Sequence, residues 1–271
     1  ALENLTPMDI QEYLRFLEIY EKNGKTYRND ASAAARKLSS LRSLYKYLLR
    51  FDMISNDPTA VIPSPKLENK AIIQLEPSEI KQALNSVYNK TSLTTTQIKF
   101  SQQFNYRDIA IITLFLGTGI RVSELVGIDL KDINFENNSI HVYRKGNKDQ
   151  YVYFNNNVKE ALLDYINLER DSEKISNKDK NALFISRKHN RISVRAVERI
   201  IEKYIDHAID GKHITPHKLR STYGTELYRA TGDIHLTADA LGHSNVAVTA
   251  KHYAEIGNER RKSIPTYTDW I

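Results

Sequence analysis

Three closely spaced prolines constrain the fold of this chain more than any other feature. They lie in SNDPTAVIPSPKLENK, residues 55–70, a segment that ends in polar residues. Because the residue before a proline is biased away from the helical conformation, the segment favours an extended linker. A chain of 271 residues is long enough for two modest domains that each bury a core. We therefore expect two domains, at residues 1–67 and 68–271.

The sequence before the linker has the pattern of two helices. Thr6 and Pro7 mark the start of the first, since Thr is a favoured cap and Pro is favoured at the first helical position. The polar stretch EKNGKTYRND, residues 21–30, breaks this helix. A second helix is expected from about Asp30 to about Phe51. Its apolar stripe consists of Leu38, Leu41, Leu44, Tyr45 and Leu48.

The opposite face of the second helix is basic. Residues 31–50 contain five basic side chains and no carboxylate. Cations interleaved with small hydroxyls suit a helix laid against DNA, where both types of side chain contact phosphates. A solvated basic face is the alternative interpretation. The side chains expected to contact DNA are Arg36, Ser39, Arg42, Ser43 and Lys46.

The sequence after the linker mixes helices with one pair of strands. A capped helix is expected at LEPSEIKQAL (75–84), then a polar surface insertion at 89–103 and a buried helix at about 106–116. SIHVYR (139–144) and QYVYF (150–154) read as strands that flank a hairpin turn, KGNKD (145–149). Further helices are expected from about Asn157, Val194, His217, Ile234 and Val246. The fold class is therefore mainly α with a small antiparallel β-sheet.

Composition narrows the classes of function. A net charge of +6 and a pI near 9.2 favour a polyanionic partner such as nucleic acid. The absence of cysteine excludes a disulfide framework, a Cys-ligated zinc site and a thiol nucleophile. No apolar run is long enough to span a membrane, and no signal peptide is visible, so we expect a cytoplasmic protein. Because the chain begins with Ala1 close to a helix cap, we expect that it is truncated at the N-terminus.

Six residues in the second half suit one reaction, the transfer of a phosphodiester through a covalent phosphotyrosine. Arg and His side chains stabilise charge on phosphate oxygens, and Lys and His move protons. The phosphotyrosine retains the energy of the broken bond, so neither a metal nor a cofactor is required. The six candidate catalytic residues are Arg121, Lys145, His217, Arg220, His243 and Tyr253.

Each residue type fits one step of that reaction. Arg121 and Arg220 would hold the non-bridging oxygens, because a guanidinium binds two oxygens in a way that an ammonium does not. Lys145 would protonate the departing 5′ oxygen. Tyr253 would be the nucleophile; a free phenol has a pKa of about 10, so a base is needed. His217 would be that base or a phosphate donor. The remaining residue, His243, would donate to a non-bridging oxygen.

Every one of these residues also has a purely structural interpretation. Arg121 can pair with Glu124 near a helix start, and KGNK is a common hairpin turn. A histidine in LGHS can be an ordinary structural residue, and Tyr253 is one of sixteen tyrosines. The argument therefore depends on the six residue types occurring together and in order.

In their local sequence contexts, these segments resemble the tyrosine recombinase and integrase family, especially the bacterial Xer recombinases. GTGIRVSELVGIDLKDI is similar to the family's first arginine motif, with Glu124 as a supporting residue, and RKGNKDQYVYF to its lysine hairpin. ITPHKLRSTYGTELY is similar to the His-x-x-Arg box, and LGHSNVAVTAKHY to the final histidine and tyrosine. The resemblance covers nearly all of residues 70–256 and, more faintly, the SSLRSLYKYLL helix.

The resemblance implies a helical core-binding domain and an α+β catalytic domain that clamp duplex DNA. It implies that the six residues form the active site of a site-specific recombinase with a 3′-phosphotyrosine intermediate. It also implies a homotetramer on two DNA sites with inverted repeats, strand exchange through a Holliday junction, and location with the bacterial nucleoid. The tail after Tyr253 would dock a short helix on a neighbouring subunit, and a loose terminus is the alternative interpretation.

Three departures from the family pattern qualify the resemblance. Ser221 follows Arg220 where the family very often has a histidine. His252 stands at the spacing from His243 that some members use for the tyrosine, but histidine cannot form a phosphotyrosine, so Tyr253 is kept. The first domain is shorter than the family fold by one or two helices.

Two other functions use related features. A type IB topoisomerase-like enzyme would nick and reseal DNA with the same chemistry, and a catalytically inactive relative would only bind DNA. Within the recombinase interpretation, resolution of chromosome dimers and integration or excision of a mobile element stay open.

Overall fold

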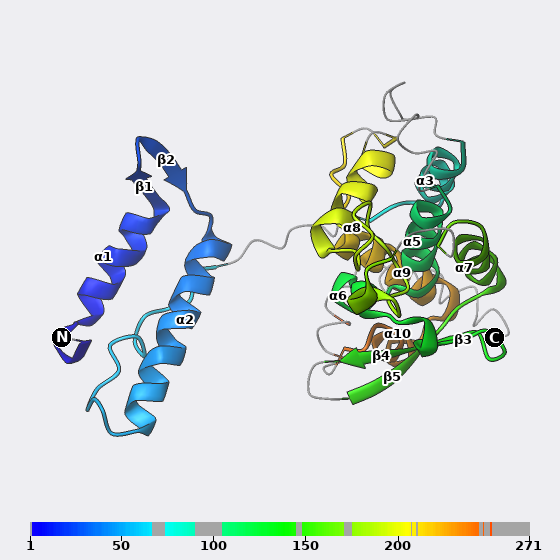
Figure 1. Cartoon of the computed structure of the whole chain (residues 1–271). Helices are drawn as coiled ribbons and strands as arrows, with labels where there is room; N and C mark the ends of the chain where they lie inside the picture. The colour runs from blue at the N-terminus through cyan, green and yellow to red at the C-terminus, as the bar shows by residue number, and fades with distance from the viewer. Residues whose placement is uncertain are drawn as a thin grey trace, which may run out of the picture. The chain divides into compact units, whose positions relative to one another are not determined.

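The computed structural model describes residues 2–66, 74–89, 105–144, 148–170, 175–206, 208–209 and 211–243, together with 246 and 250. The chain forms two compact units, Ala1–Ala71 and Ile72–Ile271 (Figure 1). The expected boundary between residues 67 and 68 lies outside the described residues.

The first unit is built from two helices and a β-hairpin. It begins with a 3₁₀ turn, η1 (Leu2–Asn4), and α1 (Pro7–Glu18), whose cap is the expected one: Thr6 Oγ1 accepts from the Asp9 N–H at 3.3 Å, and Asp9 Oδ2 accepts from the Thr6 N–H at 2.7 Å. The second helix, α2 (Ala31–Arg50), starts at the side-chain cap Asp30. Both helices therefore lie where the sequence predicts them.

The polar stretch between the two helices is not only a break. It includes the end of β1 (Ile19–Lys22) and all of β2 (Lys25–Arg28), which pair antiparallel. Asn23 and Gly24 form the turn with φ values of 52° and 70°. An Asn-Gly pair with positive φ at both positions is the favoured two-residue hairpin turn, because its twist matches that of the strands. The sequence prediction missed this hairpin.

The proline-containing segment also differs from the prediction. Ile54 and Ile62 are buried and complete a core formed with Ile10, Leu38 and Tyr45. The segment as far as Ile62 thus belongs to the first unit rather than to an extended linker, because its apolar side chains find a surface to cover. Within the predicted apolar stripe of α2, Leu44 was assigned wrongly: it is 40% exposed, since at about 100° per residue it lies beyond the edge of the stripe.

A helix with a long apolar run forms the centre of the second unit. This is α5 (Asn105–Thr118), whose side chains from Ile109 to Phe115 are buried, which confirms the buried helix predicted at 106–116. It contacts α3 (Pro77–Asn89), α7 (Asn156–Leu168), α8 (Val194–Ile201) and α9 (Pro216–Thr231) (Figure 1). The predicted insertion at 89–103 lies almost entirely outside the described residues.

A three-stranded antiparallel sheet packs against this helical core. β3 (Ile133–Asn134), β4 (Ser139–Arg144) and β5 (Lys148–Tyr153) follow one another in the sheet, and β4 and β5 are the two predicted strands. Alternate side chains such as Ile140 and Val142 are buried in the core. The hairpin turn at 145–147 lies outside the described residues.

Four of the predicted helices begin within one residue of the expected position, at Asn156, Val194, Pro216 and Ile234, and the helix predicted from Val246 lies almost entirely outside the described residues. α6 (Val122–Gly127) and the 3₁₀ turns η2 (Leu130–Asp132) and η4 (Asn177–Asp179) are short. A π-helical turn, η5 (Glu202–Asp206), continues α8, and α10 (Ile234–Leu241) packs on α9. The fold is thus mainly α with a small antiparallel sheet, as predicted. No described helix is both long and apolar enough to cross a membrane.

Candidate active site

Arg121 lies at the start of α6, immediately after the central helix α5. Its backbone N–H donates to Glu124 Oε2 at 3.0 Å, and its Nη1 donates to Glu124 Oε1 at 2.7 Å. The structural interpretation of Arg121 is therefore realised: it does pair with Glu124. The guanidinium is only partly occupied by that pairing, because Nη2 donates to the Gly242 carbonyl at 2.9 Å. Arg121 thus connects the start of α6 with the end of α10.

Arg220 reaches the same end of α10 from α9. Its side chain is buried; Nη1 donates to the Gly119 carbonyl at 2.6 Å, and Nη2 donates to the Leu241 carbonyl. The last carbonyls of a helix have no partner within the helix and carry partial negative charge. The C-terminus of α10 therefore attracts both guanidiniums and holds them close to one another.

His243 leaves α10 at this same point. Gly242 has a φ of 57° and donates its N–H to the Asp239 carbonyl at 2.7 Å, while the His243 N–H donates to the Ala238 carbonyl at 2.9 Å. These two bonds form the Schellman motif that ends many helices at a left-handed glycine. They fix the backbone of His243 directly after the carbonyl that Arg121 contacts. The structure thus brings Arg121, Arg220 and His243 together.

Gly119 was not singled out from the sequence, yet the arrangement depends on it. It has a φ of 60°, and a Cβ built on it would lie 2.4 Å from Cδ1 of Tyr223. Its carbonyl accepts from Arg220. Burial raises the pKa of the Tyr223 phenol above its ordinary value, so this ring packs over the glycine as a neutral group. Only a residue without a side chain fits this turn.

His217 lies in the first turn of α9. Thr215 caps the helix and Pro216 occupies its first position. His217 follows; it is exposed and lies three residues before Arg220. Residues three apart share a helix face, so His217 and Arg220 project toward the same side of α9. Ser221, the departure from the family pattern, donates its hydroxyl to the His217 carbonyl at 3.1 Å. Its hydroxyl is therefore bound back onto the first turn of its own helix.

Asp206, the last residue of η5, anchors the segment that leads to His217. Its Oδ1 accepts from the Ile214 N–H at 2.6 Å, and its Oδ2 lies 2.5 Å from Nδ1 of His213. Sequence reasoning did not identify Asp206, because a carboxylate seven residues before a histidine has no recognisable pattern. Lys145 and Tyr253 lie outside the described residues.

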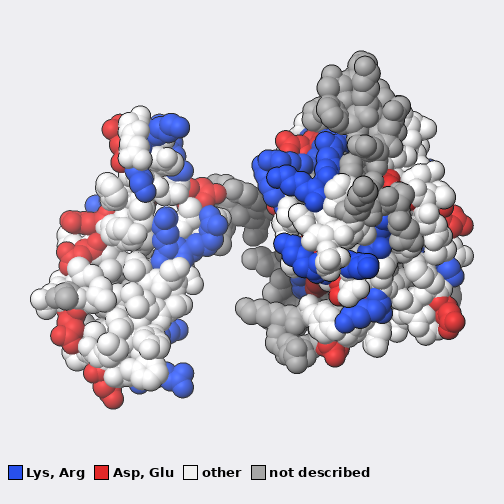
Figure 2. Space-filling model, in the orientation of Figure 1, with Lys and Arg blue, Asp and Glu red and all other residues white. Residues whose placement is uncertain are grey.

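The predicted DNA-contacting residues of α2 lie in two environments. Arg36, Ser39, Ser43 and Lys46 are exposed. Arg42 is half-buried, and it donates to Ser64 Oγ at 2.8 Å and to the Ile62 carbonyl at 2.5 Å. Arg42 therefore also holds the proline-containing segment on α2. Basic side chains of the first unit lie mainly on its α2 side and acidic ones mainly on its α1 side (Figure 2).

Two features bear on the kind of chemistry. Among the described residues, no group of three or more His, Cys, Asp or Glu side chains could hold a metal ion. The described part of the site instead gathers guanidinium and imidazole groups, which bind and protonate oxyanions. The arrangement suits stabilisation of negative charge on a phosphate.

Comparison with known proteins shows the family of the chain. The phage integrase family model matches residues 74–260. Tyrosine recombinase XerC of Caldanaerobacter subterraneus subsp. tengcongensis is 40% identical over 251 residues, which is 92% of this chain and 64% of the relative. Tyrosine recombinase XerS of Streptococcus agalactiae serotype III is 33% identical, with 97% of this chain and 79% of the relative covered. The chain thus spans less than two thirds of the length of the XerC relative.

Solved structures show the same fold. XerH recombinase bound to a palindromic difH substrate matches with a TM-score of 0.73 and 20% identity, covering 97% of this chain and 73% of XerH. The integrase of transposon Tn1549, in complex with circular intermediate DNA, matches with a TM-score of 0.70 and 22% identity, covering 93% and 82%. The fold is that of the tyrosine recombinases. The chain belongs to the phage integrase family, and its relatives are tyrosine recombinases of the Xer type.

Proposed function

We propose that this protein is a site-specific DNA recombinase that cleaves and rejoins duplex DNA through a 3′-phosphotyrosine intermediate. The observation that carries the proposal is the convergence of Arg121 and Arg220 on the Gly242 and Leu241 carbonyls, with His243 next in the chain. Two guanidiniums beside one imidazole form a preorganised site for an oxyanion. Family membership and relatives named as recombinases support the same function.

In the proposed reaction, the same six residues act in strand cleavage and again in strand rejoining. The Tyr253 oxygen attacks the phosphorus and loses its proton, with His217 as the base or as a donor to the phosphate. Arg121 and Arg220 stabilise the added charge on the non-bridging oxygens, to which His243 also donates. The bond from phosphorus to the 5′ oxygen breaks, and Lys145 gives that oxygen its proton. An incoming 5′ hydroxyl then reverses these steps and releases the tyrosine.

The proposal includes an assembly. Recombination joins two DNA sites, so we propose a homotetramer on two inverted-repeat sites that exchanges strands through a Holliday junction. The known complexes of XerH with difH and of the Tn1549 integrase with circular intermediate DNA support DNA as the partner. The task is either Xer-like resolution of dimers or movement of a mobile element, and the proposed location is the bacterial nucleoid.

Covalent capture tests the chemistry directly. The protein is incubated with fragmented bacterial DNA and denatured, and the DNA that stays attached is sequenced. We expect one short inverted-repeat site to be enriched by the wild type and lost with Tyr253→Phe. The matched control is Tyr88→Phe, at an exposed tyrosine of α3, which should capture DNA like the wild type.

The other outcomes separate the rival functions. Attachment scattered over many sequences, together with relaxation of supercoiled plasmid, would favour the topoisomerase-like reaction. Binding without attachment in the wild type would indicate an inactive DNA-binding relative. Equal capture by wild type and Tyr253→Phe would exclude Tyr253 as the nucleophile.

A further inference from the structure

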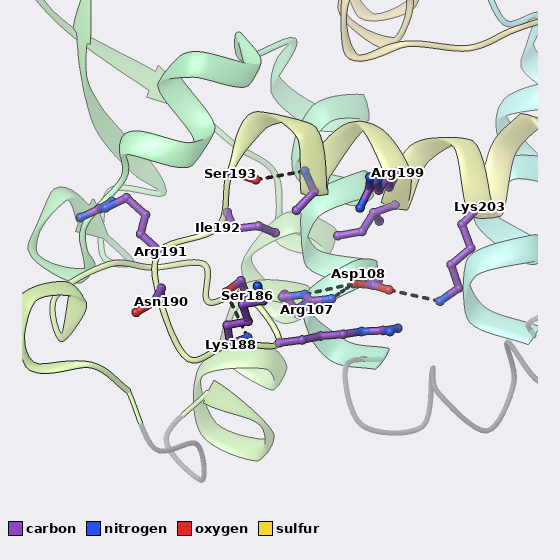
Figure 3. A pocket seen from close by; sticks show the side chains of 13 residues that line it. Arg107, Asp108, Ser186, Lys188, Asn190, Arg191, Ile192, Ser193, Arg199 and Lys203 are labelled. Carbon is purple, nitrogen blue, oxygen red and sulfur yellow. Dashed lines mark hydrogen bonds and ion pairs between the residues drawn. The ribbon is translucent and has the colours of Figure 1, made fainter.

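A basic pocket lies in the second unit, apart from the candidate active site. It has a volume of about 570 Å³ and is formed by the start of α5, the segment from Ser186 to Ser193, and the side of α8 and η5 that faces them (Figure 3). Among the described residues that line it, six are basic and one is acidic: Arg107, Arg187, Lys188, Arg191, Arg199 and Lys203 against Asp108. None of the four described active-site candidates, Arg121, His217, Arg220 and His243, lines it.

The floor of the pocket contains two cations that share one buried carboxylate. Arg107 donates to Asp108 Oδ1 from Nη2 at 2.7 Å and from Nε at 3.1 Å, and Lys203 Nζ lies 3.5 Å from Asp108 Oδ2. Figure 3 shows Arg107 and Lys203 approaching Asp108 from opposite sides. Arg107 and Asp108 are 4% and 1% exposed. One carboxylate between two cations leaves positive charge where water is scarce, and such charge attracts an anion strongly.

Lys203 lies on η5, the π-helical turn that continues α8. Its Nζ also donates to the Tyr204 hydroxyl at 2.9 Å, and the Tyr204 carbonyl accepts from the buried Ser86 hydroxyl at 2.7 Å. π-Helical turns are rare and are found frequently at functional sites. The cation at the floor of the pocket thus lies on an irregular backbone segment that a buried contact holds in place.

The pKa of Lys203 reflects the repulsion among the cations of the pocket. Burial lowers the pKa of Lys203 below its ordinary value; Asp108 acts against this, while Arg187 and Arg107 lower it further by repulsion. A bound anion would offset that repulsion among the cations. The pocket thus has an excess of positive charge.

The rim adds cations at the surface. Arg187, Lys188 and Arg199 are exposed, whereas Arg191 is held by Asp129 at 2.5 Å and by two backbone carbonyls. Several arginines around one space fit the oxygens of a phosphate, because each guanidinium offers two parallel N–H donors. A carboxylate has only two oxygens and would satisfy fewer of these groups.

We infer that the basic pocket binds a phosphate group, with Lys203 and Arg107 fixed at its floor and Arg187, Lys188 and Arg199 closing on it from the rim. The inference rests on the proposed function for the origin of this phosphate, which we take to be a backbone phosphate of DNA away from the cleaved bond. A free phosphorylated molecule presents the same chemistry and is the other possible source.

Two binding measurements with one pair of variants test the inference. The rim variant combines Arg187→Ala with Arg199→Ala and so removes two cations from the rim. The control combines Lys81→Ala with Lys131→Ala, which removes two exposed lysines of the same unit outside the pocket. Thermal unfolding establishes that both are folded. Affinity for a short fluorescent duplex is measured over a range of salt concentrations, and binding of inorganic pyrophosphate is measured by calorimetry.

For a DNA phosphate, we expect the rim variant to bind the duplex several-fold more weakly than the control. Its log–log slope against salt should be smaller by about 0.9 for every phosphate that the variant no longer neutralises. If pyrophosphate binds the wild type and the control but not the rim variant, while duplex binding is unchanged, the pocket binds phosphate from a free molecule. If rim variant and control agree in both measurements, the inference is wrong.

These outcomes are independent of catalysis. The duplex measurement uses Tyr253→Phe in all backgrounds, so it does not require strand cleavage. If the wild type captures no DNA covalently but the rim variant still weakens phosphate binding, the proposed reaction is rejected and the pocket inference stands. If the wild type captures DNA but the rim variant changes neither binding measurement, the pocket inference is rejected and the proposed reaction stands.

Discussion

Arg121 and Arg220 donate to consecutive backbone carbonyls, those of Gly242 and Leu241, at the C-terminal end of α10. Neither arginine belongs to α10: Arg121 lies at the start of α6, and Arg220 lies in α9. A helix terminus is a fixed partial charge that costs no side-chain ordering. It therefore holds both cations through backbone groups, and Arg121 is in addition paired with the buried carboxylate of Glu124.

The glycine that accepts from Arg220 should tolerate no side chain. In Gly119→Ala the new methyl group would meet the Tyr223 ring in a turn with positive φ. We expect a loss of roughly 1–3 kcal/mol in the free energy of unfolding, together with weaker covalent capture. Urea denaturation measures the first effect. The matched control is Gly127→Ala, at the end of α6, where the added Cβ meets nothing within 4 Å. Equal stability of the two variants would contradict the proposed role of Gly119.

Arg220→Lys should fail both structurally and chemically. An ammonium cannot span the Gly119 and Leu241 carbonyls as the guanidinium does, and an unpaired buried acceptor costs about 1–3 kcal/mol. Loss of one preorganised donor to the oxyanion should slow cleavage by about 100-fold or more. Single-turnover cleavage of a nicked duplex, after a folding check by circular dichroism, measures this.

A second arginine of α9 provides the control for that prediction. Arg229 pairs with Glu76 and Glu226 at the surface, where lysine can replace it. We expect Arg229→Lys to change stability by less than about 0.5 kcal/mol and to leave cleavage unchanged. If both lysine variants cleave at the wild-type rate, the proposed role of Arg220 is incorrect.

Much of the fold could be predicted because it depends on local patterns. The Thr6 cap, the apolar run of α5 and the alternation of β4 each leave a mark within a few residues. The β1–β2 hairpin was also predictable, since Asn23-Gly24 is a strong turn pattern, but the polar composition of the strands concealed it. The packing of Ile62 against α2 was not, because it depends on a surface that only the folded unit provides.

The residues of the site could be predicted from the sequence, but their arrangement in space could not. Arg121, Arg220 and His243 were identified by residue type and order, but their meeting point is a pair of backbone carbonyls. Any sequence has carbonyls, so these bonds leave no pattern to find. Gly119 and Asp206 were missed for the same reason, because the bond of each involves a backbone group: the Gly119 carbonyl accepts from Arg220, and the Ile214 N–H donates to Asp206.

Glu169 should make stability depend on pH. It lies at the end of α7, and its Oε2 accepts from the Tyr106 N–H at 2.8 Å at the start of α5. Burial raises its pKa from the usual 4.5 to about 7, against the opposing effect of that bond. The folded state then holds a proton that the unfolded state has released. This contribution to stability is complete below about pH 4.5 and is lost as the pH rises to about 7.

The measurement for Glu169 is the midpoint of thermal unfolding between about pH 5 and pH 8. We expect the wild type to lose stability relative to Glu169→Gln as the pH rises, because the amide has no proton to release. Glu160→Gln, at an exposed position of the same helix, is the control and should follow the wild type. Parallel curves for wild type and Glu169→Gln would reject a raised pKa.

The basic face of α2 should appear in the salt dependence of DNA binding. Each phosphate contact contributes about 0.9 to the log–log slope of affinity against salt, since binding releases condensed counterions. We expect Arg36→Ala and Lys46→Ala, both at exposed positions, each to reduce the slope by about that amount and to weaken binding to all sequences similarly. Fluorescence anisotropy at several salt concentrations measures it. Arg15→Ala, at an exposed position of α1, removes the same charge from the same unit and should leave the slope unchanged. If the three variants shift the slope equally, the effect is one of net charge, and α2 is no DNA-contacting face.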